Sequence, residues 1–446
     1  MSRAQPEPES WPSRRALVLS LAAVLAVGAG TFSAAILKSP TRSLLKQDGM
    51  AYFLYARSLV LDLDFDVTAD LAAIRGRFNV GATEAVDRFA REVPQTGRVV
   101  LPWPVGVGAV MAPFYAGGLA VEYLLAAVAG RDADTLGAAC ELGFATGSLI
   151  WAWIGFWLAV AACRRVTVRP GAPRGPPAIA MLAVLATGLA GPLVFYTFFH
   201  PAMSHAPSFG LVAALVLIWW RAWDHGASVL RFAALAGLCG LVAILRYQNV
   251  LFGILPAALL VREALRVGLK GAAIRAAAGA AAFAIPAAIQ VGHVVASYGG
   301  LDTGAALRDT QNPLDPTSPH FLDALFSCRH GAFYWAPLLG VGAAGLLAAA
   351  VREGWGRLFL ATFLAEAWLI GSLSGDNNWY ASAAFGMRYL IECTPLFSAG
   401  LAWLCLRAEP RAGIRTQAMV LVVPVAFNLA LILAYSLRTI PQAECG

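Results

Sequence analysis

Long stretches without any charged residue constrain this chain more than any other feature of its sequence. Residues 16–36, 232–245 and 419–435 contain none. About 20 consecutive apolar residues cross a bilayer as a helix, because lipid offers the backbone no hydrogen-bond partner. Only 13% of the 446 residues are charged, whereas a soluble protein has roughly a quarter. The sequence therefore predicts an all-α, polytopic transmembrane helical bundle.

The apolar segments predict about eleven spans. They lie near residues 16–36, 137–162, 178–196, 207–223, 232–246, 248–262, 272–293, 334–350, 358–374, 389–406 and 416–437. A further stretch, 105–130, is also long enough to cross. If it crossed, the basic residues of 164–174 and of every later basic loop would lie outside, against the positive-inside rule. We therefore expect 105–130 to be a juxtamembrane or re-entrant helix.

This topology predicts a single domain, 1–446, in the inner (plasma) membrane. The N-terminus is expected in the cytoplasm and the C-terminus outside. A first extracytoplasmic loop, 37–136, should hold short juxtamembrane helices, and a second long one covers 294–333. The Pro/Gly-rich stretch 167–177 is expected to be a cytoplasmic linker. No internal repeat is visible.

The net charge of +7 does not indicate a nucleic-acid partner, since no Lys/Arg-rich tract resembles a nucleic-acid patch. The seven cysteines form neither a metal-binding pattern nor a disulfide framework. Cys328 and Cys445 both fall outside the predicted membrane segments and could pair. No metal ligands are predicted, although a divalent cation remains possible, and no other cofactor is expected.

Asp48 follows the first predicted span by about a dozen residues. If 48–60 is helical, Asp48, Tyr52 and Tyr55 share one face. A carboxylate flanked by aromatic rings suits a general base beside a sugar-like acceptor. The alternative interpretation is a helix-capping aspartate with two interfacial tyrosines.

Three further aspartates, Asp62, Asp64 and Asp66, alternate along 61–67. An extended backbone would place them on one side. A calcium loop is excluded, because Val67 and Ala73 stand where such loops need Gly and Glu. A looser contact with a metal or a sugar remains open.

Cations and aromatic residues accompany these acids on the predicted outer side. Arg246 ends a span, and an ionisable group at a membrane boundary is a functional candidate, although arginines there also snorkel. Arg388 and the pair Arg329–His330 are similar. His205 shows no metal-ligand spacing and is more often an interfacial hydrogen-bonding residue. Buried roles for Glu141, Glu366 and Glu392 cannot be assigned from the sequence.

Five segments, in order, resemble the GT-C type polyprenyl-phosphate-dependent glycosyltransferases. This superfamily includes protein O-mannosyltransferases, aminoarabinose transferases and bacterial envelope glycosyltransferases. The segments are DGMAYFLYARSL (48–59), PWPVGVGAVMAPF (102–114), LRYQN (245–249), LFSCRHGAFYWAP (325–337) and FGMRYLIECTPL (385–396). Each is weak alone, and their order and shared face carry the resemblance.

The resemblance implies roles for individual residues. Asp48 stands where the family keeps an essential acid, often Asp-Glu, but Gly49 follows it here, which puts a two-carboxylate or metal motif in doubt. The family uses basic residues to hold the donor phosphate. Arg246 stands where relatives often have Lys or Arg, and Arg388 precedes Tyr389 as in the family's Arg-Tyr motif. Candidate substrate-binding residues are Tyr52, Tyr55, Arg57, Asp62, Asp64, His205, Arg246, Arg329, His330, Trp335, Trp379 and Arg388, with Asp48 as the catalytic base.

The expected function is transfer of a sugar from a polyprenyl-phosphate donor in the bilayer to an unknown extracytoplasmic acceptor, with inversion. A transporter or flippase of lipid-linked sugars or small molecules is the alternative. Such proteins tend to show repeats and helices interrupted at the midplane. A non-catalytic assembly subunit is a third class.

Overall fold

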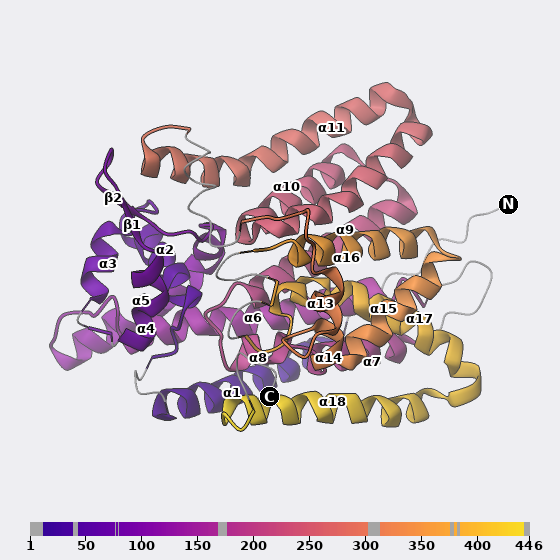
Figure 1. Cartoon of the computed structure of the whole chain (residues 1–446), viewed down its shortest axis with the longest axis horizontal. Helices are drawn as coiled ribbons and strands as arrows, with labels where there is room; N and C mark the ends of the chain where they lie inside the picture. Colours follow the sequence, from indigo (N-terminus) through magenta and orange to yellow (C-terminus); the bar gives the residue numbers. More distant parts are fainter. Residues whose placement is uncertain are drawn as a thin grey trace.

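The computed structural model describes residues 12–38, 43–75, 77–78, 80–167, 176–301, 313–374, 379–380 and 384–440. Figure 1 shows long helices lying side by side, with a group of shorter elements gathered at one end. Each predicted span overlaps a helix, although several contain a break. The bundle helices are α1 (Arg14–Lys38), α6 (Ala138–Cys163), α7 (Pro177–Leu189), α8 (Leu193–Phe198), α9 (His205–His225), α10 (Val229–Leu245), α11 (Ile254–Tyr298), α15 (Pro337–Ala350), α16 (Gly354–Gly371), α17 (Thr394–Ala412) and α18 (Ile414–Ser436).

Among the described residues, six helices are long and apolar enough to cross a membrane. They are Arg14–Ala34, Gly106–Ala129, Ala138–Cys163, His205–His225, Arg388–Ala412 and Ile414–Ser436. Three shorter helices, Pro177–Leu189, Val229–Leu245 and Pro337–Ala350, are also apolar. The outer surfaces of α1 and α18 are largely exposed apolar side chains, which is the pattern of helices that face lipid. The chain is therefore a multi-pass membrane protein.

Breaks in the helices place backbone turns at both ends of the bundle. Gly268 takes φ 76° inside α11, so α11 consists of two helices joined at a sharp bend (Figure 1). Its two parts correspond to two of the predicted spans. At the other end, a 3-10 helix, η1 (Tyr247–Gly253), separates α10 from α11. These turns let consecutive helices pack antiparallel.

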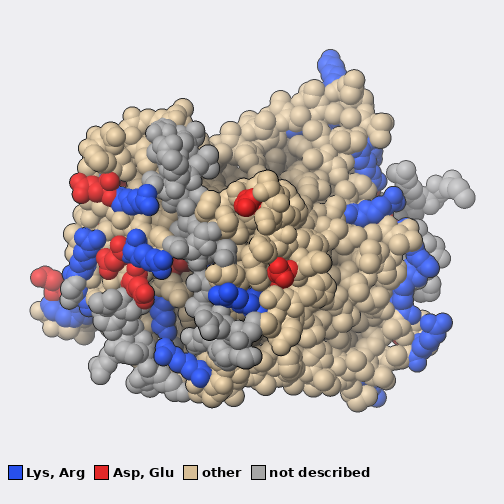
Figure 2. All heavy atoms as spheres, in the orientation of Figure 1, with Lys and Arg blue, Asp and Glu red and all other residues tan. Residues whose placement is uncertain are grey.

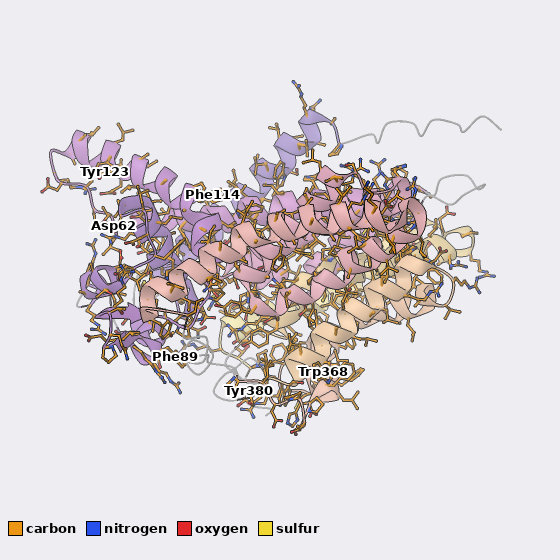
Figure 3. The ribbon with its side chains drawn as sticks, turned by 90° about the horizontal axis from the view of Figure 1, so that it is seen from above. Asp62, Phe89, Phe114, Tyr123, Trp368 and Tyr380 are labelled. Atoms are coloured by element: carbon orange, nitrogen blue, oxygen red, sulfur yellow. The ribbon has the colours of Figure 1, made fainter. Side chains whose placement is uncertain are left out.

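The predicted first loop folds into a small unit of its own. It contains α2 (Asp48–Leu61), α3 (Thr68–Ile74), α4 (Val80–Phe89), β1 (Arg91–Val93), β2 (Arg98–Val100) and α5 (Gly106–Ala129). The antiparallel β1–β2 hairpin pairs Arg91 with Val100 and was not predicted from the sequence. The stretch 105–130 is one continuous helix, α5. Figure 3 shows Phe114 near the bundle and Tyr123 at the outer edge of this unit.

The second predicted loop is shorter than expected, because α11 continues to Tyr298. This region contains α13 (Phe321–Phe326) and α14 (Ala332–Trp335). Further along the chain, a second 3-10 helix, η2 (Arg388–Cys393), precedes α17. Cys328 is disulfide-bonded, and Cys445 lies outside the described residues. The linker 167–177 also lies mostly outside them.

Charged side chains are distributed unevenly between the two ends of the molecule. On the face shown in Figure 2, Lys and Arg alone gather at the end where α17 turns into α18. The opposite end, formed by the first-loop unit, carries both signs. On this face, the two ends therefore differ in the sign of their charged side chains.

Candidate active site

Asp48 begins α2 where that helix meets the segment between α8 and α9. A Cβ added to Gly49 would lie 2.7 Å from the Cβ of Ala202, so the chain comes as close here as glycine allows. The Asp48 side chain is 18% exposed. One of its oxygens, Oδ2, lies 3.9 Å from Nη2 of Arg388. Position 49 therefore has no room for a side chain in this arrangement of the backbone.

Arg388 belongs to η2, directly after a turn at Gly386 with φ 60°. Its backbone N–H donates to the Gly386 carbonyl, and its side chain is only 6% exposed. The guanidinium carbon lies 5.4 Å from the centre of the Tyr389 ring. A buried turn therefore aims this cation at Asp48.

Arg246 reaches the same tyrosine from the break between α10 and η1. Its backbone is extended, and the Asn249 amide donates to the Val242 carbonyl at the end of α10. The guanidinium carbon lies 5.0 Å from the centre of the Tyr389 ring. Two arginines from distant parts of the chain thus rest on one aromatic ring.

Neutral groups hold the Arg246 guanidinium from several sides. Its Nη1 donates to the Ser204 hydroxyl at 3.1 Å and lies 3.1 Å from Nδ1 of His205. Nη2 donates to the Gln248 side chain at 3.4 Å, and that amide in turn donates to the Tyr389 carbonyl. The orientation of this arginine is therefore fixed before any ligand arrives.

Two buried acids lie behind Arg246. The Oε1 atom of Glu392 is 3.4 Å from Nε of Arg246 and 3.6 Å from Nδ1 of His205. Glu366 of α16 is close enough to interact electrostatically with both Glu392 and Arg246. Within the described part of the chain, all four carboxylate oxygens lack a hydrogen-bond partner.

The surroundings of Asp48 are predominantly positive. Burial raises the pKa of Tyr52, and the Asp48 charge adds to this effect. Burial, with Lys46 and Arg388, lowers the pKa of His200 to about 3, so this ring is neutral near pH 7. Burial also lowers the pKa of Lys46, as does the neighbouring charge of Arg438. The positive potential around Asp48 therefore favours binding of an anionic ligand rather than a cationic one.

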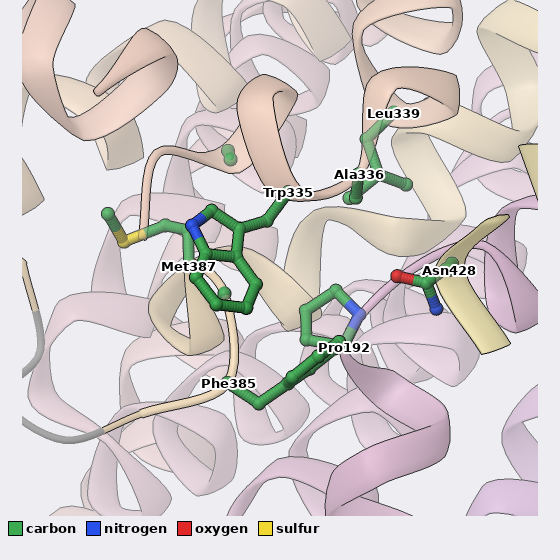
Figure 4. A pocket seen from close by; sticks show the side chains of 9 residues that line it. Pro192, Trp335, Ala336, Leu339, Phe385, Met387 and Asn428 are labelled. Atoms are coloured by element: carbon green, nitrogen blue, oxygen red, sulfur yellow. The ribbon is translucent and has the colours of Figure 1, made fainter. Parts of the chain in front are cut away.

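A narrow, mainly apolar hollow adjoins the Arg388 turn (Figure 4). It is lined by Pro192, Ala332, Trp335, Ala336, Leu339, Phe385, Gly386, Met387 and Asn428. The Trp335 indole N–H donates to the Cys328 carbonyl. The Phe385 backbone N–H donates to the hydroxyl of Tyr196. An apolar surface therefore continues directly from the cationic site.

Two of the predicted residues on α2 have structural partners. The Tyr55 hydroxyl donates to the Leu101 carbonyl at 3.3 Å, and its ring packs edge-on against His293. Arg57 pairs with Asp70 and donates to Thr135. Of the expected face of Asp48, Tyr52 and Tyr55, only Tyr52 lies with Asp48 beside the arginines.

The acidic turn 62–66 lies at the far end of α2, roughly 20 Å from Asp48 along the helix axis. Asp62 caps this helix with helical backbone angles, and Leu63 takes φ 60°, so the expected extended segment is not formed. Asp64 accepts from the Ser58 hydroxyl at 2.7 Å, and Asp66 pairs with Arg98 at 3.2 Å. Figure 3 shows Asp62 at the outer end of the molecule.

The remaining predicted residues form a separate aromatic group near the hollow. The Arg329 guanidinium lies 3.9 Å from the centre of the Tyr380 ring, and His330 contacts the Tyr380 carbonyl at 2.7 Å. Trp379 stacks on His320. Trp335 contacts His330 and Phe385, which links this group to the Arg388 turn.

Some members of the site were missed by the sequence interpretation. Ser204 and Gln248 are ordinary polar residues, whose importance depends on a helix break that no local pattern predicts. The sequence alone assigns no role to Glu392. Its position four residues after Arg388 in an apolar stretch is the signal that could have found it, because buried acids in membrane helices have partners.

No group of three or more His, Cys, Asp or Glu side chains that could hold a metal ion occurs among the described residues. At Asp48 the structure supplies one carboxylate beside several cations. This donor set does not fit a divalent ion, which prefers several oxygen ligands.

Comparison with solved structures identifies the fold. The chain is similar to ArnT from Cupriavidus metallidurans, whose crystal structure contains undecaprenyl phosphate, with a TM-score of 0.51 and 15% sequence identity. The match covers 96% of this chain and 72% of that one. No family model matches the sequence, and no curated protein matches it significantly. The chain therefore has an ArnT-like fold, in agreement with the resemblance expected from its sequence.

Proposed function

We propose that this protein is a membrane glycosyltransferase that uses a polyprenyl-phosphate sugar as donor. The observation that carries the proposal is the meeting of Asp48, Arg388 and Arg246 around Tyr52 and Tyr389. A partly exposed carboxylate can take a proton, and two oriented guanidinium groups can hold a phosphate. The ArnT structure, which has the same fold, contains undecaprenyl phosphate.

The chemistry needs one base and no general acid. Asp48 accepts the proton of an acceptor hydroxyl. The hydroxyl oxygen forms a bond to the anomeric carbon, while the bond from that carbon to the phosphate oxygen breaks. Its electron pair stays on the phosphate, which leaves as a lipid monoester, and the anomeric carbon is inverted.

Charge develops on the leaving phosphate in this step. Arg246 and Arg388 carry fixed positive charges in a largely buried setting, where preorganised cations stabilise a transition state strongly. The apolar hollow beside Gly386 and Met387 offers a surface for the lipid part of the donor. Trp335 and the neighbouring aromatic group offer faces on which a sugar can stack.

We place the site on the extracytoplasmic side. Basic residues alone gather at the opposite end of the molecule in Figure 2, as the positive-inside rule requires of a cytoplasmic face. This orientation gives eleven spans, with α5 as a juxtamembrane helix, the N-terminus inside and the C-terminus outside. A reporter fused after Gly130 should report outside, and one fused after residue 174 inside. A cytoplasmic signal at residue 130 would contradict the arrangement.

The proposal is tested with purified protein in lipid nanodiscs. A panel of undecaprenyl-phosphate monosaccharides is offered with extracytoplasmic envelope extract as acceptor, and transfer is followed by mass spectrometry. We expect transfer from at least one lipid-linked sugar and none after Asp48→Asn. Efficient transfer from a nucleotide sugar without a lipid carrier would contradict the proposed donor class.

A further inference from the structure

Glu392 is a fully buried acid that the proposed reaction does not use. It stands on η2, four residues after Arg388, and is 1% exposed. It forms an ion pair with Arg246, whose Nε lies 3.4 Å from Oε1. Because an arginine is always protonated, this neighbour favours the ionised form of the carboxyl group, whereas burial opposes it. When Glu392 is ionised, its negative charge lies beside one of the two proposed phosphate-binding cations.

A purely structural role explains this charge poorly. Arg246 already has neutral anchors in the Ser204 hydroxyl, the Gln248 side chain and the Tyr389 ring. Neither oxygen of Glu392 accepts a hydrogen bond within the described part of the chain. Removing a carboxylate from water without hydrogen bonds is expensive. An amide of the same shape would anchor Arg246 at a lower desolvation cost.

The two phosphates of the proposed reaction differ in charge. The donor is a phosphodiester with one negative charge. The lipid product is a monoester whose second pKa is about 6, so it is a dianion at pH 8. Two arginines alone would hold the dianionic product more tightly than the donor, and release of the product would then be slow.

We propose that Glu392 is a specificity-determining residue that weakens binding of the dianionic product more than binding of the monoanionic donor. The inference rests on the proposed function. Coulomb repulsion is proportional to the ligand's charge. A charge that weakens monoanion binding threefold therefore weakens dianion binding about ninefold. The ratio of the affinity for the dianion to the affinity for the monoanion therefore measures the effect of Glu392.

Direct binding tests this without any transfer reaction. Undecaprenyl phosphate and its methyl ester, a monoanionic diester, are titrated at pH 8 against the full-length protein in nanodiscs of neutral lipid. Glu392→Gln keeps the side-chain shape and removes the charge. We expect it to bind the methyl ester about threefold and undecaprenyl phosphate about tenfold more tightly than the wild type. The wild type itself should prefer the monoester by less than about threefold.

Glu122→Gln is the matched control. Glu122 is also a buried acid paired with an arginine, Arg131, but it lies in α5, away from the site. Its removal should leave both affinities unchanged. Glu392→Asp keeps the charge and should give a ratio between those of the wild type and the Gln variant.

Each outcome bears on one of the two proposals. If the wild type binds neither probe, the phosphate site of the proposed function is wrong. If the wild type binds both but Glu392→Gln leaves the ratio unchanged, the inference about Glu392 is wrong while the phosphate site stands. Weaker binding by Glu392→Gln would likewise overturn the inference and make Glu392 an anchor of Arg246. If the Gln variant does not fold, a strong wild-type preference for the monoester, above about tenfold, overturns the inference on its own.

Discussion

The two ends of α2 carry acidic residues in opposite circumstances. At the first turn, Asp48 faces Arg388 at 3.9 Å and is 18% exposed. Just beyond the last turn, Asp64 accepts a hydrogen bond from Ser58 and Asp66 is paired with Arg98. The first carboxylate keeps oxygens available among an excess of cations, whereas the other two stabilise a turn. We therefore expect the reaction to occur at the aspartate whose carboxylate is oriented by its surroundings but not fully hydrogen-bonded by its own loop.

Removing the base is the strongest test of this comparison. Asp48→Asn keeps the size of the side chain but not its basicity. We expect turnover to fall by about 10²–10⁴-fold with unchanged folding, measured as transfer from the lipid-linked donor. Asp62→Asn, at the other end of the same helix, is the control and should retain near wild-type turnover. If Asp48→Asn keeps more than about a tenth of wild-type turnover, the acidic turn 62–66 becomes the leading candidate.

Removing a cation should have the next largest effect. Arg388→Ala takes away the partner of Asp48 and one of the two phosphate-binding groups. Loss of one such electrostatic contact should reduce kcat/KM by about 10²-fold. Arg388→Lys should recover only part, because a planar fork is replaced by a single ammonium. Arg98→Ala removes the partner of Asp66 instead and should leave donor use unchanged. Equal losses of kcat/KM in Arg388→Ala and Arg98→Ala would show that the two ends of α2 do not differ in function.

The sequence predicts the helices of the bundle but not which side chains surround each residue of the candidate site. Long apolar stretches predicted the bundle helices, because the bilayer allows few other structures. Asp48, Arg246 and Arg388 were found because each lies at a helix boundary within a recognisable segment. Tyr55 was grouped with Asp48 by helical spacing alone. Spacing gives a shared face but not the bond to Leu101 that holds the Tyr55 hydroxyl away from the arginines.

The network behind Arg246 shows why such details cannot come from sequence. His205, Arg246 and Glu392 come from three separate elements, and the positions of η1 and η2 bring them together. No periodicity connects residues that far apart. The short hairpin of β1 and β2 was missed for a related reason, since three-residue strands carry too few residues to show alternation.

Steric tightness at the start of α2 predicts a smaller effect. In Gly49→Ala the new methyl group would lie 2.7 Å from the Cβ of Ala202, so the helix start must shift. A shift of a few tenths of an ångström moves Asp48 relative to the acceptor and should lower kcat by about tenfold, with donor affinity nearly unchanged. Gly117→Ala is the control, because nothing lies within 4 Å of its added carbon. A fully active Gly49→Ala would mean that Asp48 needs no exact placement.

The smallest effect on activity is expected at a second Arg–Asp pair on the same helix. Arg57 of α2 pairs with Asp70 of α3, and the Asp70 side chain is 1% exposed. Burial raises the pKa of Asp70 despite the opposing effect of Arg57, so desolvation of the carboxylate outweighs its attraction to Arg57. Arg57 also keeps its bonds to Thr135 when Asp70 is changed. Asp70→Asn should therefore lower the free energy of unfolding by only about 1–3 kcal/mol.

This variant separates a structural pair from a catalytic one. Its thermal midpoint should fall by a few degrees, while turnover per folded molecule stays within about twofold of wild type, since Asp70 touches neither arginine of the site. Asp48→Asn should show the reverse, with lost turnover and an unchanged midpoint. Both quantities are measured on the same nanodisc preparations. If Asp70→Asn abolishes transfer without lowering the midpoint, the first-loop unit takes part in catalysis beyond the start of α2, and Arg57 returns as a substrate-binding residue.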